Sequence, residues 1–371
     1  MIAYTAEAWR EELDERRQRA RRLISDASCD VGLIFGSDRH GQAFRYLTNF
    51  EPLLGDMWLL LEDDIRCFLT FQWQIIEARA LSGIEEWHGQ FDPVPLVVEA
   101  LRQCGARRVG AVGLNRMPVP AYQALLSGVP QLELVDLDAS YSLFRRRKSA
   151  FEVGLLRKAA RLTDEMLDAA RMRTRVGARE TEIAAASATI PVSVGGECAF
   201  EPTVISGIDD PVPIRRSTVR TLKVGDTVMV DVGAAVEGYQ GDATRTFVLG
   251  PPSSAQLEAW AVVRGAYDAA LSLARPGVPC KELHRVSSEI IERAGFAVAQ
   301  RIGHGIGLAT SYEWPSLDTE EAQLEPGITI CIEPGVYAPG VGNMKLEDDL
   351  IITENGYEIL THSDATLEVP I

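Results

Sequence analysis

The chain lacks any apolar stretch that approaches the ~20 consecutive residues needed to cross a bilayer. Its N-terminus is charged and does not have the basic start and apolar core of a secretion signal. It also lacks a Cys-x-x-Cys pair, because its six cysteines are scattered along 371 residues, a length that needs no disulfide staples. We therefore predict a cytoplasmic protein with free thiols and no membrane partner.

Basic residues are in the minority: 37 Lys and Arg stand against 53 Asp and Glu, so the formal net charge is −16. Such a charge repels a phosphate backbone, and we expect no nucleic-acid partner. The hydrophobic share of 46% and the charged share of 24% are those of a globular protein. Clustered carboxylates cannot all stay ionised without a cation, so the acidity directs attention to metal sites.

The first part of the chain alternates between helical and strand-like patterns. Residues 6–25 predict an amphipathic helix with Trp9, Leu13 and Ile24 on its apolar side and its arginines and glutamates on a solvated face. Strands alternating with helices indicate an α/β domain. Strands are expected at 31–35, 57–61, 66–71, 108–114 and 132–137, and further helices near 95–104 and 118–127.

A basic run at 144–149 separates this part from a long helical pattern, and by itself it is only a solvated linker. We place the domain boundary there, which gives an N-terminal domain of residues 1–144 and a second domain of residues 145–371. Helices near 151–172, 179–187 and 280–294, together with another that a Ser253 and Gln256 capping box opens and that closes near 276–277, are combined with hairpin-like strands. This mixture predicts an α+β domain, and no internal repeat is recognised in it.

Two aspartates stand at the ends of neighbouring expected strands. Asp231 ends an apolar strand and Asp242 begins the next, so a hairpin brings their carboxylates together. An acid in a Val-rich strand is costly unless it is paired or bound to a metal. Taken alone, however, one such acid is better explained by a structural salt bridge.

Three further residues extend this set. His304 is flanked by glycines that allow close backbone approach, although a lone histidine is more often an ordinary polar residue. Alternation in the segment 328–333 places three isoleucines on one face and Glu333 on the other. Glu347 enters an apolar strand that a turn at 354–357 should continue as a hairpin.

Four acids and one histidine together form an oxygen-rich ligand set. Two divalent cations neutralise the four carboxylates, and a water bridging them could readily lose a proton. Hard oxygen ligands with one imidazole favour manganese and permit iron, cobalt or zinc. The sequence thus predicts two divalent metal ions.

These segments, in this order, resemble the pita-bread metallopeptidases, a family that includes aminopeptidase P, prolidase, methionine aminopeptidase and creatinase. The resemblance covers roughly residues 145–365, and residues 1–144, with Tyr46-Leu-Thr-Asn-Phe50, look like the smaller N-terminal domain of the aminopeptidase P, prolidase and creatinase branch. It implies an α/β N-terminal domain followed by an α+β pita-bread catalytic domain. It also implies a homodimer, and Glu333 as the proton shuttle beside a bridging hydroxide. The implied metal ligands are Asp231, Asp242, His304, Glu333 and Glu347.

The sequence departs from the family pattern at three positions. Ile214 stands where proline-directed peptidases have a histidine, and it can neither donate a proton nor bind a carbonyl. Tyr312 replaces a second histidine and offers a phenol as a candidate catalytic and pocket residue. Lys345 replaces the usual arginine and loses its planar bidentate donor. These three are candidate substrate-pocket residues, and they put Xaa-Pro peptidase activity in doubt.

If a loop is shifted, one of the other histidines, His40, His88 or His284, could take over the role of the missing histidine. His40 is a further pocket candidate, because N-terminal domains of this branch commonly reach a neighbouring subunit's site, although on the sequence alone an ordinary surface histidine is the better explanation.

The main functional hypothesis is an enzyme that cleaves an amide-like C–N bond in a dipeptide, an N-acyl amino acid or a related small metabolite. One alternative is a specialised creatinase-like or lyase-like member that has left peptide hydrolysis, which the residues Ile214 and Tyr312 support. A non-catalytic binding module is a third possibility, but such modules generally lose metal ligands, and all five are kept here.

Overall fold

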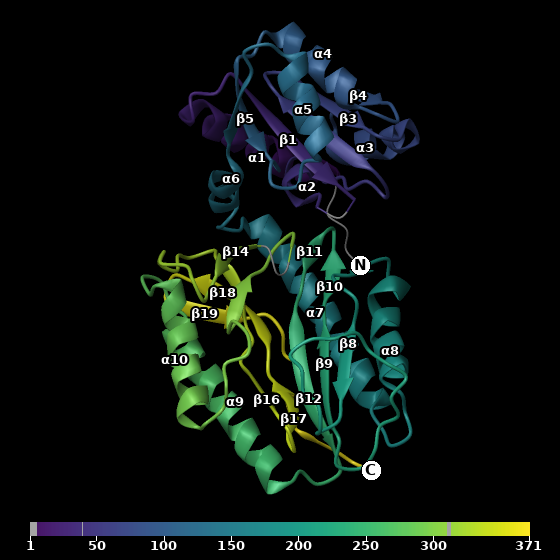
Figure 1. Cartoon of the computed structure of the whole chain (residues 1–371), viewed down its shortest axis with the longest axis vertical. Helices are drawn as coiled ribbons and strands as arrows, with labels where there is room; N and C mark the ends of the chain where they lie inside the picture. Colours follow the sequence, from purple (N-terminus) through teal and green to yellow (C-terminus); the bar gives the residue numbers. More distant parts are fainter. Residues whose placement is uncertain (1–5, 39, 310–312) are drawn as a thin grey trace. The chain divides into compact units, whose positions relative to one another are not determined.

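The computed structural model describes residues 6–38, 40–309 and 313–371. It divides into two compact units, Met1–Arg145 and Arg146–Ile371 (Figure 1). Each unit has its own sheets and its own hydrophobic core, and each is described separately below.

The N-terminal unit is built on a mixed six-stranded sheet with the order β4-β3-β2-β1-β5-β6. Strand β1 pairs in parallel with β5 and antiparallel with β2. The described strands are β1 (Val31–Ser37), β2 (Asp56–Leu61), β3 (Ile65–Leu69), β4 (Glu86–Gly89), β5 (Arg108–Val112) and β6 (Glu133–Asp136). The described helices are α1 (Ala6–Asp26), α2 (Gln42–Thr48), the short 3-10 helix η1 (Gln72–Gln74), α3 (Ile75–Ser82), α4 (Val94–Cys104), α5 (Val119–Gly128) and α6 (Asp138–Phe144).

Helix α1 forms where the amphipathic pattern predicts it, but its polar side is not simply solvated. Trp9, Leu13 and Ile24 are buried as expected. Arg16 and Arg17 are buried too, because their guanidinium groups donate to the carbonyls of Tyr46 and Leu47 at 3.2 and 2.9 Å. The prediction of a solvated face was therefore wrong for these two arginines, because they donate to carbonyls of α2, whose position cannot be inferred from the helical pattern alone.

The second unit contains four long helices and several small sheets. The described helices are α7 (Ala150–Arg173), α8 (Glu180–Ser193), α9 (Ser254–Leu273) and α10 (Cys280–Arg293). The described strands of its first half are β7 (Glu197–Cys198), β8 (Thr203–Ser206), β9 (Thr227–Val232), β10 (Ala234–Val236), β11 (Tyr239–Gln240) and β12 (Ala243–Leu249). Those of its second half are β13 (Gly303–Gly305), β14 (Glu313–Ser316), β15 (Thr329–Ile332), β16 (Gly335–Ala338), β17 (Gly342–Lys345), β18 (Asp348–Thr353), β19 (Gly356–Ile359) and β20 (Glu368–Val369).

The strands of this unit lie between two helix pairs, α7 with α8 on one side and α9 with α10 on the other (Figure 1). One sheet has the order β20-β12-β9-β8 and another the order β14-β13-β15-β18-β19. An isolated bridge between Thr244 and Glu347 connects the strand regions of the two halves. The core under α9 and α10 includes Ile328, Ile330 and Ile332, so the predicted alternation of this segment is confirmed.

The two helix pairs repeat the same local design. Ser149 and Ser253 each complete a capping box at the start of the first helix. Inside each pair, a serine hydroxyl of the second helix donates to a carbonyl of the first: Ser187 to Met166 at 3.0 Å and Ser287 to Ala266 at 2.7 Å. Glycines with positive φ follow the same spacing, at Gly177 and Gly277 and at Gly195 and Gly295. These shared features indicate that the unit contains an internal repeat, which the sequence alone does not reveal because few identical residues mark it.

The basic run before α7 is more than a solvated linker. The ammonium of Lys148 is buried and lies 3.2 Å from the carboxylate of Glu313. Arg145 is buried, with its guanidinium 5.6 Å from the ring centre of Tyr46. The local sequence is polar, but Lys148 and Arg145 are buried because they contact residues that are distant in the sequence.

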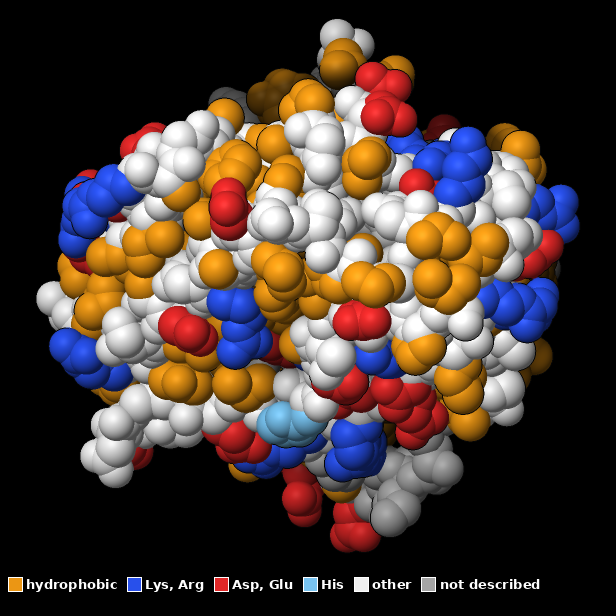
Figure 2. Space-filling view, turned by 90° about the horizontal axis from the view of Figure 1, so that it is seen from below, with side chains coloured by type: hydrophobic (Ala, Val, Ile, Leu, Met, Phe, Trp, Pro, Cys, Tyr) orange, Lys and Arg blue, Asp and Glu red, His pale blue; other side chains and the backbone are white. Residues whose placement is uncertain are grey.

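The surface mixes side chains of every kind. On the face shown in Figure 2, acidic, basic and hydrophobic side chains are interspersed. All six cysteines are free, as predicted. None of the described helices is long and apolar enough to cross a membrane.

Candidate metal centre

The four acids and the imidazole singled out from the sequence converge on one cavity of the second unit, with a volume of about 540 Å³. They come from separate segments in both halves of the unit. Asp231 lies in β9, Asp242 directly before β12, and His304 in β13. Glu333 directly follows β15, and Glu347 lies at the bridge between β17 and β18, and not inside a strand as expected.

The two aspartates approach because β9 and β12 pair antiparallel, with Asp231 opposite Thr244 and Val232 opposite Ala243. The backbone NH of Asp242 donates to Asp349 at 2.8 Å, which fixes the start of β12. Burial raises the pKa of Asp242 well above its ordinary value, and the negative charges of Glu347 and Asp231 raise it further. Without a cation, these acids thus resist ionising side by side.

His304 is held by its own strand and faces the acids. Its Nδ1 lies 2.9 Å from the carbonyl of Gly305, and its Nε2 lies 3.8 Å from Asp242 Oδ2 and 3.6 Å from Glu333 Oε1. Burial, together with the positive charge of the nearby Arg301, lowers the pKa of this imidazole to about 4. The ring is therefore neutral at pH 7, which is the form that binds a metal ion.

The glycines beside His304 serve strand packing. A Cβ on Gly303 would lie 2.2 Å from the carbonyl oxygen of Cys331, and one on Gly305 would lie 2.1 Å from that of Trp314. The close approach that these glycines allow is thus to β15 and β14. It brings the imidazole to the end of β15, where Glu333 follows.

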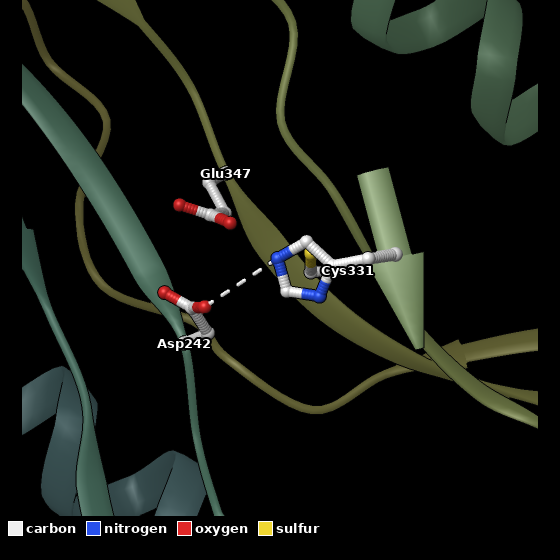
Figure 3. A group of neighbouring side chains, drawn as sticks. Asp242, Cys331 and Glu347 are labelled. Atoms are coloured by element: carbon white, nitrogen blue, oxygen red, sulfur yellow. Dashed lines mark ion pairs between the residues drawn. The ribbon is translucent and has the colours of Figure 1, made fainter. Parts of the chain in front are cut away.

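A compact subset of these donors suits a metal ion. Atoms of Asp242, His304, Cys331 and Glu347 all lie within 4.8 Å of one another and all four residues are buried. Figure 3 shows Asp242, Cys331 and Glu347 lying close together on separate segments of the chain. Burial and the charge of Glu347 raise the pKa of the Cys331 thiol well above its ordinary value, so this sulfur is protonated at pH 7.

Lys345 lies among three of the acids, Asp231, Glu333 and Glu347. Its Nζ lies 3.0 Å from Asp231 Oδ2, 2.9 Å from Glu333 Oε2 and 2.9 Å from Glu347 Oε2. Burial alone lowers the pKa of this ammonium, but the three carboxylates raise it well above its ordinary value. The residue expected to line a substrate pocket is therefore also a fixed positive charge within the acidic cluster.

The cavity wall contains residues that the sequence analysis did not select. Gln300 Nε2 donates to Glu333 Oε2 at 3.1 Å, and Arg301 Nε lies 3.9 Å from Glu333 Oε1. Both residues come shortly before His304 in the chain. This closeness to a predicted metal ligand was the one sign in the sequence that they could lie at the site. Ile214 lines the cavity with 76% of its surface exposed, on a loop that also presents Arg215.

The other predicted site residues lie elsewhere. Tyr312 falls outside the described residues. His40 is half-buried in the N-terminal unit, between β1 and α2, and its role stays a prediction. His284 accepts from the backbone NH of Ile302 at 3.2 Å, and His88 stacks on Phe68; neither of them lines the described cavity.

The donor set fits divalent ions. It offers carboxylate oxygens and a neutral imidazole, which suit hard and borderline metal ions. Among the described residues, the buried Glu347 Oε1 has no hydrogen-bond partner, although Glu347 Oε2 accepts from Thr244 Oγ1 at 2.7 Å. A buried carboxylate oxygen without a donor is costly unless a ligand completes it.

A cluster of this kind, in a repeated α+β unit that follows an α/β unit, defines a metallohydrolase of the pita-bread class. Comparison with known proteins identifies the family. The model of metallopeptidase family M24 matches residues 154–354, and that of the creatinase/prolidase N-terminal domain matches residues 16–147. The chain belongs to metallopeptidase family M24.

Several relatives are similar over most of their length. A Xaa-Pro dipeptidase of Pyrococcus horikoshii is 34% identical over 327 residues, which cover 87% of this chain and 91% of the relative. An uncharacterized peptidase of Staphylococcus aureus is 32% identical over 251 residues, covering 67% of this chain and 72% of the relative. The crystal structure of the prolidase from Pyrococcus horikoshii matches with a TM-score of 0.87 at 27% identity, covering 95% of this chain and 99% of that one.

Proposed function

We propose that this metallohydrolase uses two divalent metal ions to hydrolyse an amide-like C–N bond in a dipeptide or a small metabolite. The observation that carries the proposal is the convergence of buried carboxylates and a neutral imidazole on one cavity, with a Glu347 oxygen left without a donor. The proposed ligands are Asp231, Asp242, His304, Glu333 and Glu347.

The chemistry supplied by the bound ions is a water of lowered pKa, which acts as the nucleophile at neutral pH. Glu333 is the proposed proton shuttle, because its carboxylate opens to the cavity and is oriented by Gln300 on one oxygen. His304 faces the same carboxylate, with its Nε2 3.6 Å from Glu333 Oε1. Manganese is the proposed metal, since carboxylates dominate the donor set.

The substrate proposal follows from the cavity wall. Ile214 offers no hydrogen-bond donor to a carbonyl or a leaving amine, and losing one such donor typically costs about 100–1000-fold in rate. We therefore propose that ordinary Xaa-Pro dipeptides, the substrates named for the archaeal relative, are turned over slowly here. A smaller or better-activated C–N bond should be preferred, in keeping with a specialised member of the family.

A cytoplasmic homodimer is the proposed state, because the N-terminal unit matches the creatinase/prolidase N-terminal domain. Sedimentation at micromolar concentration should give the mass of two chains. A single species with the mass of one chain would contradict this part of the proposal, and residues such as His40 would then have to act within their own chain.

The test of function combines metal analysis with a substrate panel. Protein loaded with Mn²⁺ and then dialysed briefly should retain close to two ions per chain and should hydrolyse at least one substrate among Xaa-Pro, Pro-Xaa and N-acyl compounds. Finding no bound metal would overturn the proposed centre. Turnover of Xaa-Pro dipeptides at a rate typical of prolidases would overturn the substrate proposal while leaving the centre intact.

A further inference from the structure

The imidazole of His304 is oriented by the backbone of the next residue. Its Nδ1 lies 2.9 Å from the carbonyl of Gly305, and because a carbonyl can only accept, this nitrogen carries the proton of the neutral ring. Nε2 keeps its lone pair and faces Asp242 and Glu333 at 3.8 and 3.6 Å. The position of the Gly305 carbonyl therefore decides the direction in which the ring offers its free nitrogen.

Gly305 stands at an irregularity of the β13–β14 pair. His304 pairs with Ser316, whereas Gly305 pairs with Glu313, so two residues of β14 fall between these pairs. Their backbone packs closely on β13, since a Cβ on Gly305 would lie 2.1 Å from the carbonyl oxygen of Trp314. Extra residues in one strand re-aim neighbouring side chains, and they are common beside active sites. Glu313 thus marks the point at which β14 returns to Gly305.

A buried ion pair anchors Glu313. Its carboxylate lies 3.2 Å from the ammonium of Lys148, and the two side chains are 3% and 1% exposed. The pair packs on Gly307, because a Cβ there would lie 2.9 Å from Lys148 Cε and 3.1 Å from Glu313 Cδ. The ion pair therefore contacts both β14 and the segment that follows β13.

The backbone around Lys148 is itself fixed to the strand that leads to Glu333. The NH of Lys148 donates to the carbonyl of Gly327 at 2.8 Å, and Arg147 forms an isolated bridge with Ile328. Ile328 directly precedes β15, which pairs with β13 and ends beside Glu333. Lys148 thus links the position of Glu313 to the strand that presents another proposed ligand.

Stability alone does not explain two charges at this place. Removing an ammonium and a carboxylate from water is costly, and apolar residues of similar volume often replace a buried ion pair without loss of stability. An ion pair does, however, fix the separation of its two partners. Here the fixed partners lie at the strand irregularity beside His304.

We propose that the Lys148–Glu313 ion pair positions the His304 imidazole, by holding the irregular start of β14 against Gly305, whose carbonyl orients the ring. Lys148 and Glu313 are positioning residues, since neither is among the residues that line the cavity. The inference rests on the proposed function, in which His304 is a metal ligand.

The first test measures metal affinity in the full chain. Lys148→Met combined with Glu313→Gln removes both charges and leaves neither one buried alone. Calorimetric titration of the metal-free protein with Mn²⁺ should show an affinity about 10–100-fold lower than that of the wild type, the usual cost of losing a residue that orients a ligand. Titrations well below the Tm of each variant keep unfolding out of the result. Glu313→Gln alone is the second variant if the double variant does not fold.

The second test needs no metal. ¹⁵N NMR of the metal-free protein, labelled in its histidines, should show the His304 ring protonated on Nδ1 at pH 7 in the wild type. In the double variant the signal should report a mixture of both tautomers, because the Gly305 carbonyl no longer holds its position. The absence of one signal from His304→Ala assigns it.

Glu180→Gln is the matched control, because Glu180 is also a buried carboxylate with a basic partner, Arg215 at 2.6 Å, and is not a proposed ligand. It should lose stability but keep the metal affinity and the His304 tautomer of the wild type. An equal loss of affinity in the control would mean that the Lys148–Glu313 pair acts only through stability, and it would overturn the inference.

The remaining outcomes separate this inference from the proposed function. Unchanged affinity and tautomer in the double variant would overturn the positioning role and leave the proposed function standing. A change in only one of the two readouts would overturn the route through the Gly305 carbonyl. A wild type that binds no metal would overturn the proposed function, and the tautomer of His304 would then decide the positioning role by itself.

Discussion

Two buried acidic sites of the second unit are satisfied in very different ways. Glu180, at the start of α8, accepts six hydrogen bonds from Ser206, Arg215 and Thr218, at 2.6–2.8 Å. At the candidate metal centre, one ammonium serves three carboxylates, and Glu347 Oε1 has no partner among the described residues. The chain itself supplies the hydrogen-bond donors that Glu180 needs, whereas the acids at the candidate metal centre need a bound ligand.

The same contrast occurs between neighbours in the sequence. Asp348 accepts from Arg245, Tyr267 and Thr361 at 2.6–2.8 Å, whereas Glu347 directly before it keeps an open oxygen. The number of acids alone therefore does not mark a metal site. The distinguishing feature is how many donors of the chain reach each carboxylate.

The largest expected effect comes from Glu333→Ala. This change removes a proposed ligand and the proposed proton shuttle, so kcat should fall by about 1000-fold or more. Steady-state assays of the Mn²⁺-loaded protein check it, with Cys331→Ala as the control that should keep its metal, because the neutral thiol is not a proposed ligand. Full activity in Glu333→Ala would show that the centre is misassigned.

Removal of the metal should destabilise the protein at the candidate metal centre. It should not affect the site around Glu180, where the chain itself supplies the hydrogen-bond donors. A ligand present at about 100 times its Kd stabilises the folded state by about 2.7 kcal/mol. Thermal unfolding with and without Mn²⁺ should therefore show a higher Tm for the loaded wild type, and almost no change for Asp242→Asn. An equal rise in both proteins would show that manganese stabilises the fold from some other position.

Glu180→Gln should lower the free energy of unfolding by about 1–3 kcal/mol at pH 7, because the donors around it lose a charged acceptor. Burial raises the pKa of this carboxyl, but hydrogen bonds from Arg215, Ser206 and Thr218 outweigh it and lower the pKa to about 2. Its contribution is thus complete above the ordinary value of 4.5 and is lost as the pH falls toward 2.

Urea unfolding of wild type and Glu180→Gln at a series of pH values measures this difference. The gap between them should narrow below pH 4.5. A gap that stays constant with pH would mean that Glu180 acts through packing and not through its charge. Metal content should stay unchanged in the variant, since Glu180 is not a proposed ligand.

The smallest expected effect is that of Ile214→His, on the loop that Glu180 holds through Arg215. A histidine restores a donor on the cavity wall, so activity on Xaa-Pro dipeptides should rise several-fold from a low base, which is less than the about 100–1000-fold that one well-placed donor can supply. Ile214→Gln is the matched polar control. No gain with either residue would argue that this loop does not contact the substrate.

The sequence was sufficient for features that depend on neighbouring residues. The Ser253 capping box, the alternation before Glu333 and the hairpin after β18 all form as predicted. They could be predicted because each needs only a few consecutive side chains and a strand or helix period.

Features that depend on distant partners could not be predicted. Arg16 is buried because a carbonyl of α2 accepts a hydrogen bond from it, and Lys345 lies among acids of which two, Asp231 and Glu333, come from other segments. The periodic pattern of each segment is compatible with an exposed side chain at these positions. Only the tertiary arrangement decides which charged groups are enclosed.

Because the unit contains an internal repeat, the proposed metal ions would also hold its two halves together. Asp231 and Asp242 belong to the first half of the unit, and His304, Glu333 and Glu347 to the second. Ions bound by both sets would act as a non-covalent cross-link between the halves, in addition to the backbone that joins β12 to α9. A chain cut in that connection would leave each fragment with an incomplete ligand set. Reassembly of the two fragments should therefore depend on metal, so that the bound ions would control the association of the two halves.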